Sequence, residues 1–497
     1  MSDIAIFDVL EHHAQKGAQV AVVCGEESIT YADLHRRAEL AAFALADRGV
    51  GSGDLVGLAL PNGIDFFVAL FATYRLDATP MPLSCKLPGP EFSAIVETAR
   101  PALVVDASFE LQPPSSAGRQ ELPSAMGTQP WKAMCSGGST GRPKVIVAGR
   151  PARVDVTEKQ YFVVPDDVVL VPGPLYHQGP FISATGAIFT GSTAVVMGRF
   201  DAYEALVLIE RYRVTYLYLV PTMIHRIWRL DAATRDSFDL SSVRLMLCTG
   251  APWSPWLKKE WLRWFGPERV VEGYGGTEEQ GGVSITGVEA LEHPGSIGAA
   301  HDGVAVLDED GRVLPRGALG ELCFRASGFG SHRYLGAEIV ERNGWRSYGD
   351  VGYIDEDGYV YLVDRRTDMI VTGGSNVYPA ELESVLEAHP AVRSAAVIGL
   401  PDDDLGQRVH AIVDVAGRES DAELVSQLNS HVRDHVAAYK APRTYELVGN
   451  LLRDDAGKLR RSALRSARVP GAAQDEGDSG LLTMTGRERE PKGAPRS

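Results

Sequence analysis

The stretch Ser136-Gly137-Gly138-Ser139-Thr140-Gly141-Arg142-Pro143-Lys144 says most about the fold of this chain. Its glycines leave the backbone free to wrap around a ligand, and its hydroxyls and cations are suitable partners for phosphate oxygens. It is not a Walker motif, in which Lys directly follows the last Gly and Ser or Thr directly follows Lys. Taken alone, such a stretch is more often a plain surface turn, so the phosphate interpretation depends on the rest of the chain.

A second glycine-rich segment further along the chain carries groups suited to a nucleotide. It runs Glu272-Gly273-Tyr274-Gly275-Gly276-Thr277-Glu278. The face of Tyr274 could cover a purine, and Glu278 could hold Mg²⁺, which prefers carboxylate and phosphate oxygens. In isolation, a glycine turn with an exposed Glu explains this segment better.

Length and composition limit the function classes. A chain of 497 residues with 44% hydrophobic content is long enough for two or more domains. Its net charge of −16 argues against a nucleic-acid partner that relies on net charge. Five scattered cysteines give neither a disulfide framework nor CxxC metal spacing, and no targeting segment or long apolar run is present. We therefore expect a soluble, cytoplasmic protein with no membrane span.

Hydrophobic periodicity predicts alternating strands and helices in the larger part of the chain. A helix is expected from Thr30 to Arg48, with Thr30 and Asp33 as a capping pair. Further helices are expected at 66–74 and 203–211, and buried strands at 55–60, 168–171, 193–197 and 216–220. The alternation predicts an α/β fold with layered subdomains.

After Glu341 the composition of the sequence changes, with a stretch rich in Gly and Asp at 348–358, and a domain boundary is expected near Asp364. Beyond it, helices are expected at 379–388 and 421–435 and strands at 395–398 and 409–415. The chain is thus divided into a large N-terminal domain (1–364), a small mobile α+β C-terminal domain (365–466) and a tail (467–497). The tail is expected to be disordered because it is rich in Gly, Pro and charge.

The order of these segments resembles the acyl-adenylate-forming superfamily of acyl-CoA synthetases, luciferases and peptide-synthetase adenylation domains, over residues 31–461. The matching segments, in order, are Gly49…Gly53-Asp54, Pro61-Asn62, the 136–144 loop, Pro174-Leu175-Tyr176-His177 with Gly179, Val220-Pro221-Thr222-Met223, Gly250-Ala251-Pro252, 272–278, Tyr348-Gly349-Asp350, Asp364-Arg365, Gly373 to Glu381, Tyr439-Lys440-Ala441-Pro442 and Gly457-Lys458. The wording of the 136–144 loop is similar to that of bile-acid-CoA-ligase-like synthetases.

The resemblance implies ATP or acyl-AMP, Mg²⁺ and coenzyme A as cofactors, and a role for each matching position. The loop residues Ser136, Gly137, Gly138, Ser139, Thr140, Gly141 and Lys144 would contact the pyrophosphate. Gly250, Ala251, Pro252 and the 272–275 segment would frame the adenine, Thr277 would bind the α-phosphate, and Glu278 would coordinate Mg²⁺. Asp350 and Arg365 would hold the ribose hydroxyls, an acceptor beside a forked donor.

The catalytic residues implied by the resemblance are Lys458, Thr277 and Glu278. Lys458 would lie between the acid and the α-phosphate, where negative charge must be offset. The family's small domain then turns, Lys458 leaves, and the loop with Gly373 and Gly374 helps to form a pantetheine tunnel. Thr367 occupies the pivot position. A hinge depends on backbone torsions rather than charge, so we expect the rotation to be retained.

The acid pocket is expected among His177, Gly179, Phe181, Tyr218, Met223, Gly275 and Gly281. Phe181 to Ala184 contain no acidic residue to anchor a substrate amine, which favours a plain carboxylic acid. If the glycines of the 275–282 segment leave space, the acid is bulky and hydrophobic, polycyclic or medium-chain. The alternative is that these glycines serve tight turns only.

Several positions depart from the family pattern: Asp77, Val145, Tyr348, Thr367, Leu452 and Asp454. They leave three hypotheses open. The first is an AMP-forming acyl-CoA synthetase, an acid–thiol ligase that acts on a small-molecule acid and CoA. The second is an enzyme that mainly thioesterifies an adenylate made by a partner enzyme, or that loads a carrier protein. The third is a non-catalytic acyl-nucleotide-binding protein. A homodimer is compatible with all three.

Overall fold

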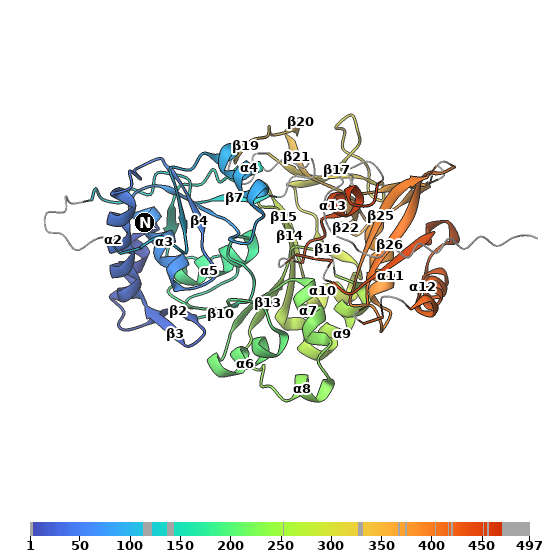
Figure 1. Cartoon of the computed structure of the whole chain (residues 1–497), viewed down its shortest axis with the longest axis horizontal. Helices are drawn as coiled ribbons and strands as arrows, with labels where there is room; N and C mark the ends of the chain where they lie inside the picture. Colours follow the sequence, from blue (N-terminus) through green and yellow to red (C-terminus); the bar gives the residue numbers. More distant parts are fainter. Residues whose placement is uncertain are drawn as a thin grey trace, which may run out of the picture. The chain divides into compact units, whose positions relative to one another are not determined.

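The structure is a computed structural model of the chain, and it describes residues 3–112, 122–136, 144–251, 253–326, 332–365, 368–372, 375–402, 404–415, 417–418, 421–450, 452–454 and 457–469. The chain divides into two compact units. The first is Met1–Leu362 with Asp455–Lys458, and the second is Val363–Asp454 with Leu459–Ser497. As predicted, the fold is mixed α/β with a large N-terminal and a small C-terminal domain (Figure 1).

The main sheet of the first unit has the strand order β15-β14-β13-β12-β10-β11-β2-β3. The strands from β14 to β2 are parallel, and β15 and β3 are antiparallel edges. Its strands are β2 (Val20–Cys24), β3 (Glu27–Thr30), β10 (Val168–Val171), β11 (Thr193–Val196), β12 (Tyr216–Leu219), β13 (Leu245–Cys248), β14 (Val270–Gly275) and β15 (Gly282–Thr286). The inner strands are almost wholly apolar because helices cover a parallel sheet on both faces.

The helices of this unit pack their apolar faces into one large core. They are α1 (Asp8–Ala14), α2 (Tyr31–Ala46), α3 (Ile64–Arg75), α4 (Gly89–Ala99), α5 (Gln178–Thr190), α6 (Ala202–Tyr212), α7 (Pro221–Trp228), α8 (Ala232–Asp236), α9 (Pro255–Phe265) and α10 (Gly287–Glu292), with the 3₁₀ turn η1 (Pro267–Arg269). The predicted capping pair is present, because the Asp33 N–H donates to Thr30 Oγ1 at 3.1 Å. The other predicted helices and strands of this unit are also confirmed, with ends shifted by a few residues.

Smaller sheets complete the first unit. The parallel sheet β5-β4-β6 consists of β4 (Leu55–Ala59), β5 (Thr79–Pro82) and β6 (Leu103–Asp106), and β1 (Asp3–Ala5) pairs with β9 (Arg153–Asp155). The antiparallel sheet β19-β8-β7 joins β7 (Ala133–Ser136), β8 (Lys144–Val147) and β19 (Arg333–Leu335). A second antiparallel sheet, β16-β22-β21-β18-β17 with β20, contains β16 (Ser296–Ala299), β17 (Val304–Leu307), β18 (Gly320–Arg325), β20 (Glu341–Arg342), β21 (Trp345–Ile354) and β22 (Tyr359–Arg365).

The second unit has its own core, on the sheet β25-β26-β27. Its strands are β23 (Ile370–Thr372), β24 (Ser375–Val377), β25 (Ser394–Asp402), β26 (Gly406–Asp414) and β27 (Thr444–Val448), and its helices are α11 (Pro379–Glu387), α12 (Ala422–His435), η2 (Ala438–Lys440) and α13 (Arg461–Ser466). The predicted α+β character is confirmed. β25 and β26 are longer than expected because their ends pair beyond the apolar runs.

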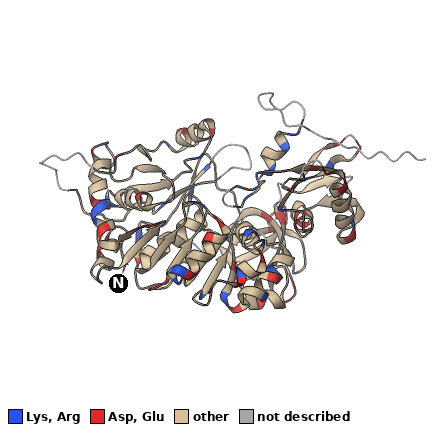
Figure 2. Ribbon diagram, turned by 60° about the horizontal axis from the view of Figure 1, so that its bottom comes forward, with Lys and Arg blue, Asp and Glu red and all other residues tan. Residues whose placement is uncertain are grey.

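Two further properties bear on function. Within the described residues, no helix has the length and the apolar content that a membrane span needs. Figure 2 shows Lys and Arg interspersed with Asp and Glu along the ribbon. This distribution agrees with a small-molecule enzyme better than with a protein that follows a polyanion.

Candidate active site

The predicted phosphate loop connects two paired strands. Ser136 at the end of β7 is the register partner of Lys144 at the start of β8, so the loop leaves and returns at one place. Gly137, Gly138, Ser139, Thr140 and Gly141 lie outside the described residues. The structure therefore fixes the base of the loop.

Lys144 lies next to the predicted metal ligand. Its Nζ is 3.4 Å from Glu278 Oε1 and 4.4 Å from the centre of the Tyr334 ring on β19. The Tyr334 hydroxyl donates to the same Glu278 oxygen at 2.9 Å. Burial, followed by the Glu278 carboxylate, raises the pKa of Tyr334, which keeps the phenol protonated as a donor.

Thr277 and Glu278 are the central residues of the turn between β14 and β15. Gly275 pairs with Gly282, and the Glu279 N–H donates to the Gly276 carbonyl at 3.1 Å. Glu278 thus lies at the carboxyl ends of the parallel strands, shortly after β14. Open α/β sheets bind ligands at this edge.

The predicted nucleotide-binding residues gather at the ends of β13 and β14. Gly250 has a positive φ of 94° just beyond β13, and Ala251 follows it, whereas Pro252 lies outside the described residues. The Tyr274 hydroxyl donates to Asp350 Oδ2 at 2.5 Å, and the Tyr274 ring stacks on Phe324. An aromatic ring and a buried carboxylate therefore lie side by side, which is the combination predicted for the adenine and the ribose.

Glu272 and Gly273 lie within β14, where Glu272 has a structural partner. Its Oε2 is 2.5 Å from the Nζ of Lys258 on α9, and both side chains are largely buried. This pair ties α9 to the sheet beneath the turn.

Glycines in the predicted acid pocket face aromatic rings. A Cβ at Gly179 would clash with Tyr218, one at Gly276 with Tyr348, and one at Gly281 with Phe324. At Gly276 and Gly281 rings fill the space that the glycines of the 275–282 segment were expected to leave open. Gly275 is exposed on β14.

The remaining pocket residues surround α5. His177 precedes the helix and lies 4.6 Å from the Tyr176 ring, centre to centre, and the buried Phe181 lies 5.7 Å from Trp131. Met223 is buried on α7, and its Cε would be 3.6 Å from a Cβ at Gly173. The structure thus brings α5, α7 and the sheet edge together.

Predicted residues near the C-terminus fall in both units. Gly457 and Lys458 belong to the first unit, where Gly457 has a φ of 76° and a Cβ there would be 2.6 Å from Thr222 Oγ1. In the second unit, Asp364 Oδ2 accepts the Ala380 N–H at 3.0 Å. Thr367, Gly373, Gly374 and the side chain of Arg365 lie outside the described residues.

Sequence reasoning missed a buried charge cluster beside the turn. Lys132 Nζ is 2.8 Å from Glu279 Oε1, and the Lys132 side chain is only 2% exposed. Burial lowers the pKa of Lys132, and the Glu279 carboxylate opposes that shift. Trp131-Lys132-Ala133-Met134 held the available signal, because a Lys within an apolar strand run needs a buried partner.

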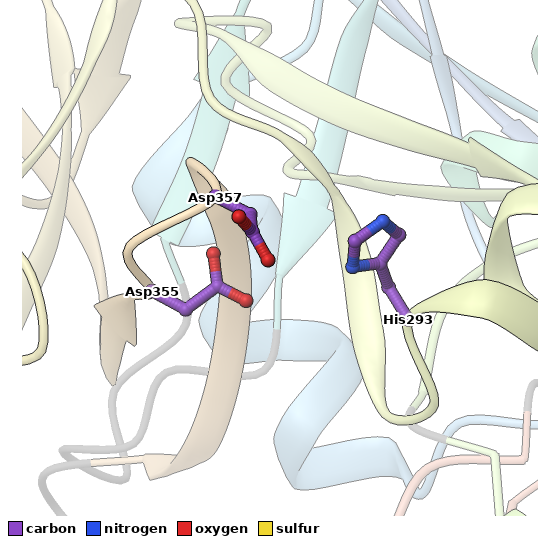
Figure 3. A group of neighbouring side chains, drawn as sticks. All are labelled: His293, Asp355 and Asp357. Atoms are coloured by element: carbon purple, nitrogen blue, oxygen red, sulfur yellow. The ribbon is translucent and has the colours of Figure 1, made fainter.

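Another group of candidate metal ligands lies at the turn between β21 and β22 and the end of α10. His293, Asp355 and Asp357 each bring one ligand atom within 4.8 Å of the others (Figure 3). Asp355 Oδ1 accepts the Tyr359 N–H at 2.7 Å, and the His293 ring stacks on Tyr359. These contacts account for the group as a brace for the β21–β22 hairpin.

Comparisons with known proteins agree with this geometry. The AMP-binding enzyme family matches residues 10–130 and 122–332, and the AMP-binding enzyme C-terminal domain matches 381–458. A feruloyl-CoA synthase from Amycolatopsis sp is 32% identical over 90% of this chain and 95% of its own. A fatty acid–[acyl-carrier-protein] ligase, ScoC, from Streptomyces coeruleorubidus is 30% identical over 91% of this chain and 94% of its own.

The fold also matches solved structures over almost the whole chain. The o-succinylbenzoate CoA synthetase MenE from Bacillus subtilis, in complex with the acyl-adenylate intermediate OSB-AMP, has a TM-score of 0.79 and 26% identity. The match covers 94% of this chain and 99% of that one. Together with the turn at Glu278 and the Tyr274–Asp350 pair, these matches show that the chain belongs to the AMP-binding enzyme family, as an adenylate-forming acid–thiol ligase.

Proposed function

We propose that the protein converts a hydrophobic carboxylic acid to its CoA thioester through an acyl-AMP intermediate. The observation that carries this proposal is the Glu278 carboxylate, which lies between Lys144 and Tyr334 at the edge of the parallel sheet. A carboxylate with an ammonium group 3.4 Å away suits a magnesium-bound polyphosphate. Glu278 would bind Mg²⁺, which would offset phosphate charge, and Lys144 would contact phosphate oxygens.

Other residues of the proposed site divide between nucleotide and acid. Tyr274 would cover the adenine beside Gly250 and Ala251, and Asp350, with Arg365, would hold the ribose. Thr277 would donate to the α-phosphate. Lys458 would offset the charge of the acid and the phosphate as they approach, and it would be needed for adenylation alone. Rotation about Thr367 and the domain limits 1–364 and 365–466 remain part of this proposal.

For the acid, the filled glycine positions favour a flat molecule over a bulky polycyclic one. Tyr218, Tyr348 and Phe324 occupy the space beside Gly179, Gly276 and Gly281. Rings of this kind pack well against a planar substituent. The relative named feruloyl-CoA synthase makes aryl acids the first class to test, with medium-chain and polycyclic acids in the same panel.

A carrier-protein thiol is the second candidate acceptor, because one relative is named as a fatty acid–[acyl-carrier-protein] ligase. An adenylate supplied by a partner enzyme is a related alternative, in which the first half-reaction would be weak. Both differ from the main proposal in a single measurable step.

The test separates the two half-reactions. The purified protein is incubated with ATP, Mg²⁺ and each acid while pyrophosphate release is measured, and in parallel with synthetic acyl adenylate and CoA or phosphopantetheinylated carrier protein. Acid-dependent pyrophosphate release followed by acyl-CoA is the expected result. Thioester from the adenylate without pyrophosphate release would contradict the proposal in favour of a partner enzyme.

A further inference from the structure

The residue that follows Glu278 has a backbone conformation that bulky side chains rarely adopt. Glu279 has a φ of 52°, in the left-handed region, where Gly or Asn is usual. Its N–H closes the turn by donating to the Gly276 carbonyl at 3.1 Å. The turn that presents Thr277 and Glu278 therefore ends on an unfavourable conformation that other interactions must offset.

The side chain of Glu279 supplies those interactions. Its Oε1 is 2.8 Å from Lys132 Nζ and accepts hydrogen bonds from Gln178 Nε2 at 3.0 Å and Tyr161 Oη at 3.1 Å. Arg150 Nε lies 3.8 Å from Oε2. These donors fix the position of the Glu279 carboxylate, and the fixed side chain in turn restrains the backbone of residue 279.

The anchors come from segments that border other parts of the proposed site. Lys132 directly precedes β7, which leads into the 137–143 loop. Gln178 opens α5 directly after His177, and it also accepts a hydrogen bond from Lys132. Glu279 thus links the Thr277–Glu278 turn to the start of β7 through Lys132 and to the start of α5 through Gln178.

Tyr161 reaches Glu279 from a second strained turn. Gln160 and Val163 exchange backbone hydrogen bonds of 3.0 and 2.9 Å, and Tyr161 and Phe162 between them have φ values of 51° and 71°. Positive φ at both central positions defines a type I′ turn, for which Asn-Gly is preferred. Two aromatic residues in this turn are conformationally unfavourable. The turn nevertheless places the Tyr161 hydroxyl within hydrogen-bond distance of Glu279.

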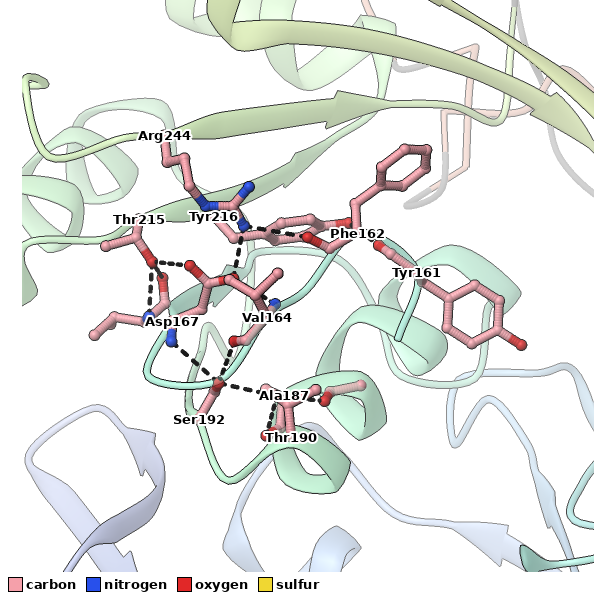
Figure 4. A network of polar contacts seen from close by, with 12 residues as sticks. Tyr161, Phe162, Val164, Asp167, Ala187, Thr190, Ser192, Thr215, Tyr216 and Arg244 are labelled. Carbon is pink, nitrogen blue, oxygen red and sulfur yellow. Dashed lines mark hydrogen bonds and ion pairs between the residues drawn. The ribbon is translucent and has the colours of Figure 1, made fainter. Parts of the chain in front are cut away.

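A partly buried polar network holds the strained turn (Figure 4). Tyr216 Oη donates to the Tyr161 carbonyl at 3.2 Å, and Arg244 donates to the Phe162 carbonyl at 3.1 Å. Arg244 is in turn paired with Asp167 at 2.7 Å, and the Asp167 side chain is 4% exposed. Hydrogen bonds from β12 and from the residue just before β13 thus hold the conformation of this turn.

We propose that Glu279 is a positioning residue for adenylation, which acts by fixing the turn through Lys132 and Tyr161. The anchored turn holds Thr277 and Glu278 in place before the nucleotide arrives, so that no reorganisation accompanies the reaction. This inference rests on the proposed role of Glu278.

The test is the double variant Lys132→Met/Glu279→Gly, which removes both buried charges and relieves the left-handed strain at residue 279. Pyrophosphate release, thioester formation from synthetic acyl adenylate and Tm are measured. We expect kcat for adenylation to fall about 30-fold, KM for the acid and the thioester step to change less than about threefold, and Tm to change less than about 3 °C. Adenylation within threefold of wild type, or equal loss in both half-reactions, overturns the proposal.

Three further variants sharpen the result. Arg213→Gly is the matched control, because Arg213 also has a left-handed φ, of 50°, and an ion pair with Asp239 in which both side chains are exposed. It should leave both half-reactions unchanged. Lys132→Arg keeps the charge and should retain most adenylation. Tyr161→Phe keeps the strained turn without the hydroxyl and should lower adenylation kcat about fivefold.

Glu278→Gln separates the proposed function from the positioning role of Glu279. If it abolishes adenylation while the double variant stays within threefold of wild type, the positioning role of Glu279 fails and the proposed function stands. If Glu278→Gln leaves adenylation intact, the proposed role of Glu278 fails, and the positioning role that rests on it fails too.

Discussion

The ring of Tyr348 lies where a side chain on residue 276 would stand, so Gly276 and Tyr348 fit only as a pair. The Tyr348 hydroxyl accepts the Gln280 N–H at 3.1 Å and donates to the Gly281 carbonyl at 2.8 Å. One tyrosine from β21 therefore contacts both sides of the Thr277–Glu278 turn. This explains how a departure from the family pattern is accommodated.

Gly276→Ala should destabilise the first unit by about 1–3 kcal/mol, because the added methyl group overpacks against the Tyr348 ring. The second substitution Tyr348→Thr should recover stability in that background. Urea unfolding checks both. Gly198→Ala is the control, since among the described residues nothing lies within 4 Å of a Cβ there. Additive losses in the double variant would contradict the pairing.

Tyr274→Phe should raise KM for ATP by about 3- to 10-fold and leave kcat nearly unchanged. The variant keeps the aromatic face but removes the donor to Asp350, and the net contribution of a hydrogen bond, about 0.5–1.5 kcal/mol, corresponds to a change of this size. Steady-state kinetics with varied ATP measure the effect. Tyr203→Phe, at a tyrosine that is 53% exposed, should have no effect. A fall in kcat at constant KM would argue against the nucleoside role.

Lys458→Ala should lower adenylation at least 100-fold and change thioester formation from acyl adenylate less than fivefold. A cation placed where charge develops contributes about 3 kcal/mol or more to the transition state. The two half-reactions are assayed separately, with the exposed Lys259→Ala as control. Equal loss in both steps would contradict the proposed division of labour.

Acid should weaken the second unit through Glu446. Burial opposes ionisation of Glu446, but Arg468 and His410 outweigh it and lower its pKa from 4.5 to about 2. A depressed carboxyl pKa stabilises the fold fully above about pH 4.5 and loses that contribution as pH falls toward 2.

Between pH 6 and pH 3.5, this loss should be about 1 kcal/mol, measured as the opening free energy of β27 by hydrogen exchange. Glu446→Gln should make that pH dependence shallower. Glu423→Gln, at an exposed position of α12, should leave it as in the wild type. An unchanged slope in Glu446→Gln would show that the Arg468 pair does not control acid stability.

The sequence predicted the fold well where local pattern and burial agree. Apolar runs such as Val168–Val171 became inner strands of the parallel sheet, and the Thr30–Asp33 pair capped α2 as expected. Asp77 shows why a Gly is common at its position in the family: its φ is 53°. Its carboxylate accepts hydrogen bonds from Ser52 and Thr128, which offset that conformation.

The site was less predictable because its decisive contacts join segments far apart in the chain. No local pattern pairs Lys132 with Glu279, and glycines in a sequence do not reveal which ring occupies the space they leave. Gly179 and Tyr218 illustrate this, since they are far apart in sequence but in contact in the fold. Which side chains fill the space beside a glycine depends on the packing of many distant segments. The outline of the pocket therefore cannot be predicted from local sequence.

The three rings that rest on glycines also constrain how this protein can diverge. A single substitution at either member of such a pair produces a clash or a void. A double substitution in which the two changes compensate would alter the shape of the predicted acid pocket without loss of packing. Changes in acid preference should therefore arise as coupled replacements at 179 with 218, 276 with 348, or 281 with 324. Libraries that vary the two positions of a pair together will find new preferences that one-at-a-time scans miss.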